Sequence, residues 1–173
     1  RVHDARIWSR PSVPPPLFAA AASAPTAAWA ADWADGVITV GHDPEEVGRI
    51  LAAYRDAGGR GPRAVQVHVS LGSSRAEALQ AAADQWRQAT VPADLMWDIM
   101  QPEDFDRLAD PSDVEGIQRG VLVGADDREV AERLAALAAA GADRLYLHEV
   151  AKDQRHFLDR AGDGLLDTIR KLT

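Results

Sequence analysis

The stretch Val65-Gln66-Val67-His68-Val69-Ser70-Leu71 alternates strictly between apolar and polar side chains. Successive side chains of a β-strand point to opposite faces, so this period of two predicts one apolar face and one polar face. A central strand of an open, doubly wound sheet is covered by helices on both sides and is typically apolar on both faces. A strand of an α/β barrel buries one face under the outer helices, and polar residues on its other face can line the barrel mouth. The alternation therefore favours a barrel.

Apolar runs bounded by turn residues lie on both sides of this stretch, and amphipathic stretches separate them. The runs are Leu17–Ala22, Gly36–Val40, Gly120–Gly124 and Arg144–Val150. Short strands that alternate with helices are typical of βα units with a parallel sheet. In the last run, Leu145 and Leu147 alternate with Tyr146 and His148, which supports the same interpretation.

Several helices have starts that the sequence makes visible. Asp43 stands before a proline and two glutamates, which predicts an N-cap, a proline at the first helical position and a helix that runs to about Ala57. Ser74 and Glu77 have the spacing of a capping box. Asp126 opens another helix, and a glycine follows the end of its apolar face.

The length of the chain limits how much of a barrel it can form. A complete (β/α)8 barrel needs about 250 residues, and this chain has 173. We therefore expect an α/β fold with a single domain over residues 1–173, the C-terminal half of a TIM barrel. Residues 73–118 are expected to form a helical insertion before the last strand, with short helices such as Glu103–Ala109, because prolines interrupt the pattern there. A flavodoxin-like open sheet is the alternative, but Asp126-Asp127 is more typical of a helix cap than of a signalling site.

Composition argues against several classes of function. The chain has 19 Lys and Arg against 27 Asp and Glu, a net charge of -8, and its basic residues are scattered, so nucleic acid is a poor partner. It has no cysteine, which excludes disulfides and zinc–thiolate sites and fits a cytoplasmic location. The apolar stretch Leu17–Ala31 is too short to span a bilayer, and the prolines and aspartates around it do not fit a signal peptide. We expect no membrane partner.

The order of motifs along the chain resembles that of a known family. Pro14-Pro15-Pro16-Leu17 runs into Ala19-Ala20, and a short alanine-rich helix leads to Trp33-Ala34-Asp35-Gly36-Val37-Ile38-Thr39. This segment is similar to one in the luciferase-like flavin monooxygenases and their deazaflavin-dependent relatives. The last third, Arg144–Val150 with Asp153-Gln154-Arg155-His156-Phe157-Leu158, resembles the closing strand and helix of the deazaflavin-dependent glucose-6-phosphate dehydrogenases. The middle, Trp97-Asp98-Ile99 with Pro102-Glu103-Asp104-Phe105-Asp106, resembles flavinoid oxidoreductases thought not to use the deazaflavin.

The resemblance covers only the C-terminal half of that family's barrel and implies a flavin-dependent oxidoreductase. Such an enzyme transfers hydride or activates oxygen on a small-molecule substrate, with FMN as the expected cofactor and the deazaflavin coenzyme as the alternative. The residues that the resemblance assigns to the cofactor pocket follow two strands: Ala21, Ala22, Ser23, Thr39, Val40 and Gly41. Relatives have a Gly-Gly where this chain has Ala21 and Ala22. Alanine does not readily adopt the positive φ that glycine permits, which favours a flavin seated differently from the deazaflavin.

Three residues bear on the substrate. His68 and Arg119 stand where the sugar-phosphate dehydrogenases hold the substrate phosphate with a lysine and an arginine, and His148 is expected to line the same barrel mouth. A neutral imidazole binds phosphate more weakly than an ammonium group does, which argues against glucose 6-phosphate. The structural alternatives are a core histidine bonded to Gln66 or Ser70 and a plain surface arginine. The catalytic residues of relatives lie mostly in the N-terminal half, so none is assigned.

A half barrel leaves two strand edges and an apolar interior uncovered, and both favour association. We therefore expect this chain to pair with the missing N-terminal half or with a second copy of itself. The alternative function is a non-catalytic half-barrel module that binds a flavin or another anion and self-associates. We expect no metal site, because the spacing of the candidate ligands is not that of a known motif. Those candidates are His148, Glu149, Asp153 and His156, and the residues expected to serve packing are Trp29, Trp33, Trp86 and Trp97.

Overall fold

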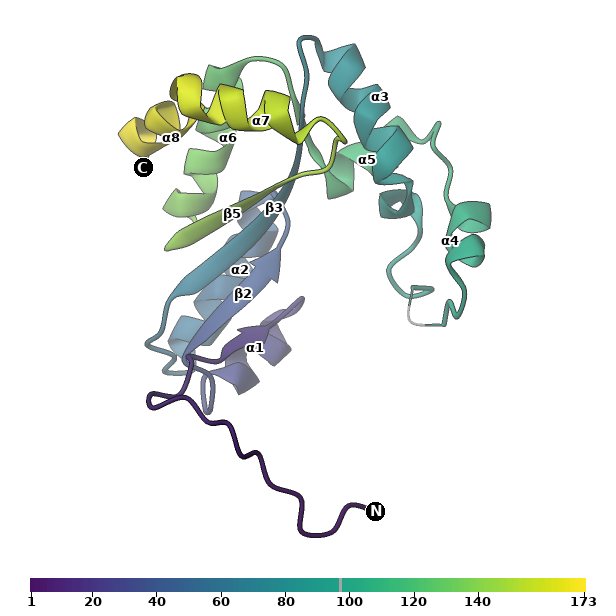
Figure 1. The fold of residues 1–173 in the computed structure, drawn as a ribbon. Coiled ribbons are helices and arrows are strands. Elements are labelled where there is room, and N and C mark those ends of the chain that lie inside the picture. The colour runs from purple at the N-terminus through teal and green to yellow at the C-terminus, as the bar shows by residue number, and fades with distance from the viewer. Residues whose placement is uncertain (97) are drawn as a thin grey trace.

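A computed structural model describes residues 1–96 and 98–173 and contains a parallel sheet with strand β3 at its centre (Figure 1). The strands are β1 (Phe18–Ala20), β2 (Gly36–Val40), β3 (Arg63–Leu71), β4 (Leu122–Gly124) and β5 (Arg144–Glu149). Strand β2 pairs with the first part of β3, and β5 runs along its other side. Strand β4 pairs with the last residues of β3, beyond the end of β2. The strands predicted from the apolar runs are thus confirmed, with shorter ends at β1 and β4.

Helices follow the strands as the βα pattern predicts. They are α1 (Ala24–Ala30), α2 (Pro44–Asp56), α3 (Arg75–Gln85), α4 (Pro102–Leu108), α5 (Val114–Gly120), α6 (Asp127–Ala139), α7 (Gln154–Arg160) and α8 (Leu166–Leu172), with a 3-10 turn at Arg87–Thr90 and a π turn at Ala161–Leu165. No helix in the described part of the chain is both long and apolar enough to cross a membrane. Residues 1–16 are exposed and precede the first strand as an extended segment (Figure 1).

The two faces of β3 have the character that the alternation predicts. Val65, Val67 and Val69 are fully buried in the main apolar core, together with Leu134 and Leu137 of α6. Full burial of such a side chain stabilises the fold by roughly 1.5–3 kcal/mol. The opposite face, which we call the inner face, carries the residues of the other parity, of which Gln66 and His68 are partly exposed and Ala64 and Ser70 are buried. This division into one buried and one open face is what a barrel strand requires.

The inner face is open around Gln66, whereas α3 covers it at Ser70, whose hydroxyl donates to the Ala78 carbonyl oxygen at 2.7 Å. It carries Phe18, Ile38, Gln66 and Tyr146, which line a hollow of about 340 Å³. Tyr146 is 49% exposed, and Val40 on the same face is 50% exposed. In a closed barrel these side chains would point into the interior.

The predicted helix caps are confirmed, with one correction. The Asp43 carboxylate accepts a hydrogen bond from the Glu45 N–H at 2.9 Å, and Ser74 Oγ accepts one from the Glu77 N–H at 3.2 Å. The predicted capping box is incomplete, because the Glu77 carboxylate bonds the N–H and hydroxyl of Ser73 and not the N–H of Ser74. The hydroxyl of Ser73 offers a second donor, so the carboxylate reaches one residue further back.

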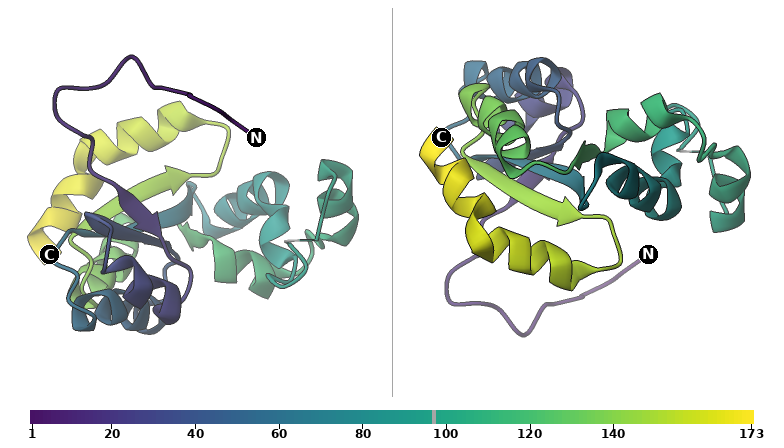
Figure 2. Two further views of the ribbon diagram at one scale, coloured as in Figure 1. Left: turned by 90° about the horizontal axis from the view of Figure 1, so that it is seen from below. Right: turned by 90° about the horizontal axis from the view of Figure 1, so that it is seen from above.

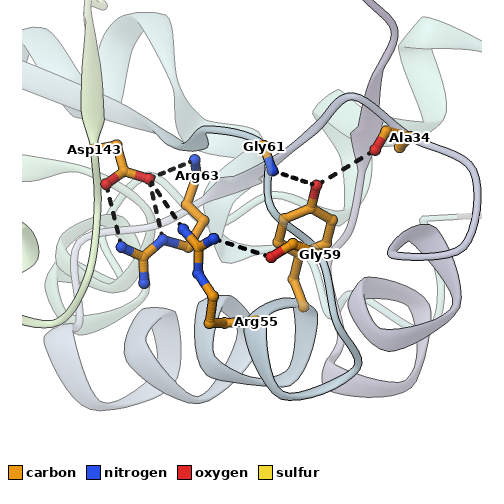
Figure 3. Close-up of polar contacts among 7 residues, drawn as sticks. Ala34, Arg55, Gly59, Gly61, Arg63 and Asp143 are labelled. Carbon is orange, nitrogen blue, oxygen red and sulfur yellow. Dashed lines mark hydrogen bonds and ion pairs between the residues drawn. The ribbon is translucent and has the colours of Figure 1, made fainter.

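At the amino ends of the strands, a polar network joins segments far apart in sequence (Figure 3). The Asp143 carboxylate, just before β5, accepts hydrogen bonds from the Arg63 N–H at 2.9 Å and from its guanidinium at 3.1 and 3.2 Å. Arg55 lies 3.9 Å from the same carboxylate. The Arg63 guanidinium bond is the main reason that the pKa of Asp143 is lowered. In α/β barrels this end of the strands usually serves stability, while the other end carries the site.

The helices between β3 and β4 project from one end of the sheet (Figures 1 and 2). Helix α4 confirms the short helix predicted near Glu103–Ala109, but α5 was not predicted, and it shifts the start of the next strand to Leu122. A second, smaller apolar cluster joins α3 to α5 and contains Ala78, Ala82, Ala83, Ile117, Val121, Val123 and Val150. That residues 73–118 form an insertion in the barrel stays a prediction.

Trp29 of α1 and Trp33 in the turn after it do not pack into the core, contrary to the prediction. Trp29 and Trp33 contact each other edge to face with ring centroids 5.1 Å apart, but they are 62% and 46% exposed. Helix α1 turns its alanine face, Ala27 and Ala30, toward the sheet, so the larger side chains lie outside. Trp97 lies outside the described residues.

Candidate functional site

A groove of about 420 Å³ lies at the carboxyl ends of β1 and β2, and we call it the strand-end groove. Its lining residues are Ala20, Ala21, Ala22, Thr26, Ile38, Thr39, Val40 and Gln66. The groove therefore brings together Ala21, Ala22, Thr39 and Val40, which the sequence predicted for the cofactor pocket. Ser23 and Gly41 come directly after these segments and do not line the groove themselves. The carboxyl ends of the strands are where α/β barrels build their sites.

Thr39 is the polar residue of the groove whose position is hardest to explain by structure alone. It is 4% exposed, and its hydroxyl has no hydrogen-bond partner among the described residues. An unsatisfied buried hydroxyl costs about 1–3 kcal/mol, so such groups usually have a partner in the functional state. A ligand in the groove can supply that partner.

Gly41 ends β2 with a backbone conformation that favours glycine. Its φ is 141°, and its N–H donates to the Gln66 carbonyl oxygen at 3.1 Å. Residues other than glycine rarely adopt a φ in this region. The turn lets the chain leave β2 while still bonded to β3, which shapes the end of the strand-end groove.

Ala21 and Ala22 fit their positions without the freedom of glycine. Among the described residues, Asp4 is the one non-glycine residue with a positive φ, so both alanines have ordinary backbone angles. The Ala21 N–H donates to the Ile38 carbonyl oxygen at 2.9 Å, which fixes the loop after β1 against β2. Ser23 caps α1 by accepting a hydrogen bond from the Thr26 N–H at 3.4 Å. The walls of the groove are mostly methyl groups and aliphatic side chains, which can pack against the face of a planar ring.

A cluster of three aromatic rings lies further along the inner face, and we call it the His68–Trp86–His148 cluster. His68 of β3 and His148 of β5 are register partners in the sheet. Their ring centroids lie 5.2 Å apart, and Trp86 at the end of α3 lies 4.6 Å from His68 and 5.0 Å from His148. The structure thus brings together two predicted substrate residues, and it adds Trp86 to them. Trp86 also packs against the smaller apolar cluster, as predicted.

The environment of His68 favours a neutral imidazole. Its Nε2 lies 3.1 Å from the side-chain nitrogen of Gln66. An amide nitrogen only donates, so this arrangement makes Nε2 the acceptor. Burial lowers the pKa of His68, and the nearby His148 lowers it further, while a hydrogen bond to the backbone of Gly120 acts in the opposite direction. The bond to Gln66 is the one expected for a core histidine, although the ring also faces the cluster.

Arg119 does not join this cluster. Its guanidinium lies 3.6 Å from the Asp113 carboxylate, and its side chain is 68% exposed. Residues 113 and 119 both belong to the end regions of α5, so the ion pair stays within one helix. This placement agrees with the structural alternative of a surface arginine.

Glu149 is a buried acid whose place the sequence did not explain. It is 4% exposed, and its two carboxylate oxygens accept hydrogen bonds from the N–H groups of Leu71 at 3.1 Å and Ala151 at 3.0 Å. Burial raises the pKa of this carboxyl group. Leu145, Leu147 and Glu149 alternate along β5 and therefore lie on its core face. An acid at such a position is the signal from which the sequence could have predicted a buried Glu149. Glu149 ties the ends of β3 and β5 together beside the aromatic cluster.

The described residues contain no group of three or more histidine, aspartate or glutamate side chains placed to hold a metal ion. Two of the acids considered from the sequence have structural contacts instead. Glu149 binds backbone N–H groups, as above, and the Asp153 carboxylate caps α7 by accepting from the His156 N–H at 3.1 Å.

The architecture and the groove define a class of molecule. A parallel sheet with helices on one face, an open inner face and a groove at the carboxyl ends of its strands is part of an α/β barrel. A sequence model of the luciferase-like monooxygenase family matches residues 1–144. The chain therefore belongs to the luciferase-like monooxygenase family.

Comparison with relatives shows how much of a longer protein this chain represents. The chain is 26% identical over 181 residues to the F420-dependent glucose-6-phosphate dehydrogenase of Intrasporangium calvum, a match over 99% of this chain and 54% of that protein. It is 28% identical over 179 residues to the Microbacterium testaceum enzyme of the same name, a match over 98% of this chain and 53% of that protein. The chain spans about half the length of these relatives.

A solved structure confirms the predicted half barrel. An F420-dependent secondary alcohol dehydrogenase in complex with an F420-acetone adduct superposes with a TM-score of 0.80 at 17% identity. The match covers 95% of this chain and 52% of that one. At this level of identity the likeness concerns the fold, and the fold is an incomplete (β/α)8 barrel.

Proposed function

We propose that the whole protein is an oxidoreductase that uses a flavin-type cofactor, and that this chain supplies part of the cofactor pocket through its strand-end groove. The observation that carries the proposal is the buried Thr39 hydroxyl, which has no hydrogen-bond partner among the described residues, in a groove that is otherwise lined mainly by apolar groups. The position of the groove at the carboxyl ends of the strands supports it. When bound, the cofactor supplies hydride or activated oxygen for a small substrate.

In this proposal the residues of the groove have distinct tasks. Ile38 and Val40 exclude water from one side of the ring, and the Thr39 hydroxyl bonds a polar atom at its edge. The backbone between Ala21 and Ser23 lies next to the groove and is where the polar chain of the cofactor would leave it. The inner face beyond the groove, with His68 and His148, forms one wall of the substrate cavity. Arg119 stays a candidate anion contact only if its ion pair with Asp113 opens.

Two arguments bear on which ring is bound. The names of the curated relatives favour the deazaflavin coenzyme F420. The alanines at 21 and 22 favour FMN, because a phosphate contact built on glycine with a positive φ is not available there. We place the deazaflavin coenzyme first on the strength of the relatives, with FMN as the second candidate.

The test is a titration of the purified chain with each cofactor, followed by cofactor fluorescence. The Thr39→Val variant keeps the shape of the side chain and removes its hydroxyl. A lost hydrogen bond of about 0.5–1.5 kcal/mol is expected to weaken cofactor binding by roughly twofold to tenfold. Thr173→Val at the exposed end of the chain is the matched control and should bind as the unmodified chain does. Equal binding by both variants would contradict the proposed contact. If the unmodified chain binds neither cofactor, this chain does not form the pocket by itself.

A second candidate function is favoured by the exposure of the inner face. A half barrel with Val40 and Tyr146 about half exposed, and with free edges at β1 and β5, can close by pairing with a copy of itself. Such a dimer would be a binding module without turnover if the catalytic residues belong to the N-terminal half. Tight cofactor binding by a dimer that shows no oxidoreductase activity would favour this candidate.

A further inference from the structure

The His68–Trp86–His148 cluster carries information on the substrate class, and the argument rests on the proposed function, in which the inner face lines the substrate cavity. Gln66 connects this cluster to the strand-end groove. It lines the groove and the inner hollow, and its amide nitrogen bonds His68 at 3.1 Å. A substrate that approaches a ring in the groove therefore meets Gln66 and the cluster next.

The charge of the His68 ring decides which groups this wall of the cavity can bind. With the Gln66 amide nitrogen facing Nε2 of His68 at 3.1 Å, Nε2 is the acceptor, and burial also favours the uncharged ring. Protonation would turn Nε2 into a donor that faces another donor, the Gln66 amide nitrogen. A second imidazole, that of His148, lies 5.2 Å away, so a positive charge on both rings would be repulsive.

The arginines near this wall have partners of their own. Arg119 pairs with Asp113, and Arg87, the residue after Trp86, lies 3.8 Å from Asp106. Arg144 lies over the Phe18 ring, 5.9 Å from its centroid, at the far end of β5 from His148. Phosphate esters are usually held by arginine, lysine or backbone N–H groups in charge-assisted hydrogen bonds. Arg133, beside His42, contacts the His42 ring nitrogen at 3.4 Å and the Val123 carbonyl oxygen at 3.5 Å, so it too has partners within the fold.

The wall presents aromatic ring surfaces to a ligand. Trp86 and the two imidazoles present flat ring surfaces, with centroids 4.6 to 5.2 Å apart. Aromatic rings bind apolar and aromatic groups by burial and by stacking or edge contacts. The Gln66 side-chain oxygen and the ring nitrogens of His148 are hydrogen-bonding groups next to these surfaces. The wall is therefore apolar, flat and able to make one or two neutral hydrogen bonds.

We propose that the part of the substrate that meets the His68–Trp86–His148 cluster is uncharged, a carbonyl or hydroxyl group on an apolar or aromatic body, and is not a phosphate ester. A phosphorylated sugar would bring two negative charges to a wall on which Gln66 and Trp86 carry no charge and the environment of His68 favours its neutral form. An uncharged alcohol or ketone needs only the hydrogen bonds that Gln66 and His148 can make.

The test is an NMR titration of the isotope-labelled full chain that follows the ring signals of the histidines and Trp86, above the ordinary histidine pKa of 6.5. The neutral probes are benzyl alcohol and cyclohexanone, and the anionic probes are inorganic phosphate and glucose 6-phosphate. The neutral probes are expected to shift the His148 and Trp86 signals in a saturable way, with a dissociation constant about tenfold or more below that of the anions. Stronger binding of either anion, or no shift with any probe, would overturn the proposal.

A variant gives an independent readout. His68→Lys places an ammonium group on the wall, and a charge-assisted hydrogen bond should strengthen binding of inorganic phosphate by about tenfold. His3→Lys adds the same charge in the exposed N-terminal segment and should leave phosphate binding at the cluster unchanged. The backbone spectrum of each variant reports whether it is folded. If the unmodified chain already binds phosphate at the cluster as tightly as the lysine variant does, the wall is not selective and the proposal fails.

Cofactor titration of the same sample separates this inference from the proposed function. If neutral probes bind the cluster but neither cofactor binds the groove, the proposed function fails while the assigned ligand chemistry stands. If a cofactor binds and phosphate outcompetes the neutral probes, only the substrate inference fails.

Discussion

Asp143 shows how one residue can fasten elements that lie far apart in the sequence. Its carboxylate binds both the backbone N–H and the guanidinium of Arg63, and Arg55 lies nearby (Figure 3). The bonds join the start of β5 to the start of β3, the two strands with the longest shared ladder. A paired arrangement of this kind contributes more than a single surface ion pair does.

Replacing Asp143 tests this contribution. Asp143→Asn should lower the free energy of unfolding by about 1–2 kcal/mol, because charge-assisted bonds are lost at a side chain that is still partly exposed to solvent. Urea denaturation of the variant and the unmodified chain measures the difference. Asp167→Asn removes an exposed partner of Arg170 and is the matched control, with an expected loss of less than about 0.5 kcal/mol. A loss as small at Asp143 as at Asp167 would show that the network adds nothing.

The same residue predicts a pH dependence with a definite sign. The pKa of Asp143 is lowered from 3.8 in the folded chain, chiefly by the Arg63 side chain. Its stabilising contribution is therefore present in full above 3.8 and is lost as the pH falls through the lowered pKa. Asp143→Asn should flatten this part of the curve of unfolding free energy against pH.

At the scale of elements, helix α3 depends on a cap and carries Trp86 to the histidines. Ser74→Ala removes the hydroxyl that accepts the Glu77 N–H, and the expected loss of stability is about 1 kcal/mol. Hydrogen exchange should show faster exchange in the first turn of α3. Ser9→Ala in the exposed N-terminal segment is the control and should change neither quantity. Unchanged exchange in the first turn would mean that the Ser73–Glu77 bonds cap the helix without Ser74.

The elements also show which parts of the fold could be predicted from the sequence. Strand β2 and helix α2 were predictable within a residue or two at their ends, because local signals such as alternation, the Asp43 cap and the closing glycines all agree there. Helix α5 was missed although Asp113 caps it, since prolines on its N-terminal side hid the short pattern. The groove could be placed only through a family resemblance. The position of Trp86 against the histidines depends on how α3 packs, which no local pattern encodes.

At the scale of the whole molecule, the chain has the buried core of a barrel on one side and an unfinished surface on the other. The main core lies between the helices and the outer face of β3, so half the barrel can hold its own shape. The inner face keeps Val40 and Tyr146 about half exposed. Covering that face requires a complementary surface with its own strands.

Completion of the barrel can be measured directly. The chain alone is expected to form dimers or larger species by light scattering, because exposed strand edges and apolar surface favour association. Coexpression with a separately encoded N-terminal half from a homologous protein should give a one-to-one complex and reduce self-association. The Tyr146→Lys variant places a charge on the inner face and should weaken both kinds of pairing, whereas Tyr54→Phe, in the buried outer layer, should weaken neither. A chain that stays monomeric and does not bind the N-terminal half would contradict the half-barrel interpretation.

The Gly72 N–H donates to the Gly124 carbonyl oxygen at 3.1 Å, a bond that joins the carboxyl ends of β3 and β4. Strand β4 begins at Leu122, which pairs with Val69, so the segment from Gly72 to Val121 is expected to accept replacement by one of another length while β3 and β4 keep their pairing. For protein engineering, this makes the projecting helices a replaceable cassette. Shuffling that cassette between homologues would exchange the tryptophan that meets the two histidines while the strand-end groove stays in place.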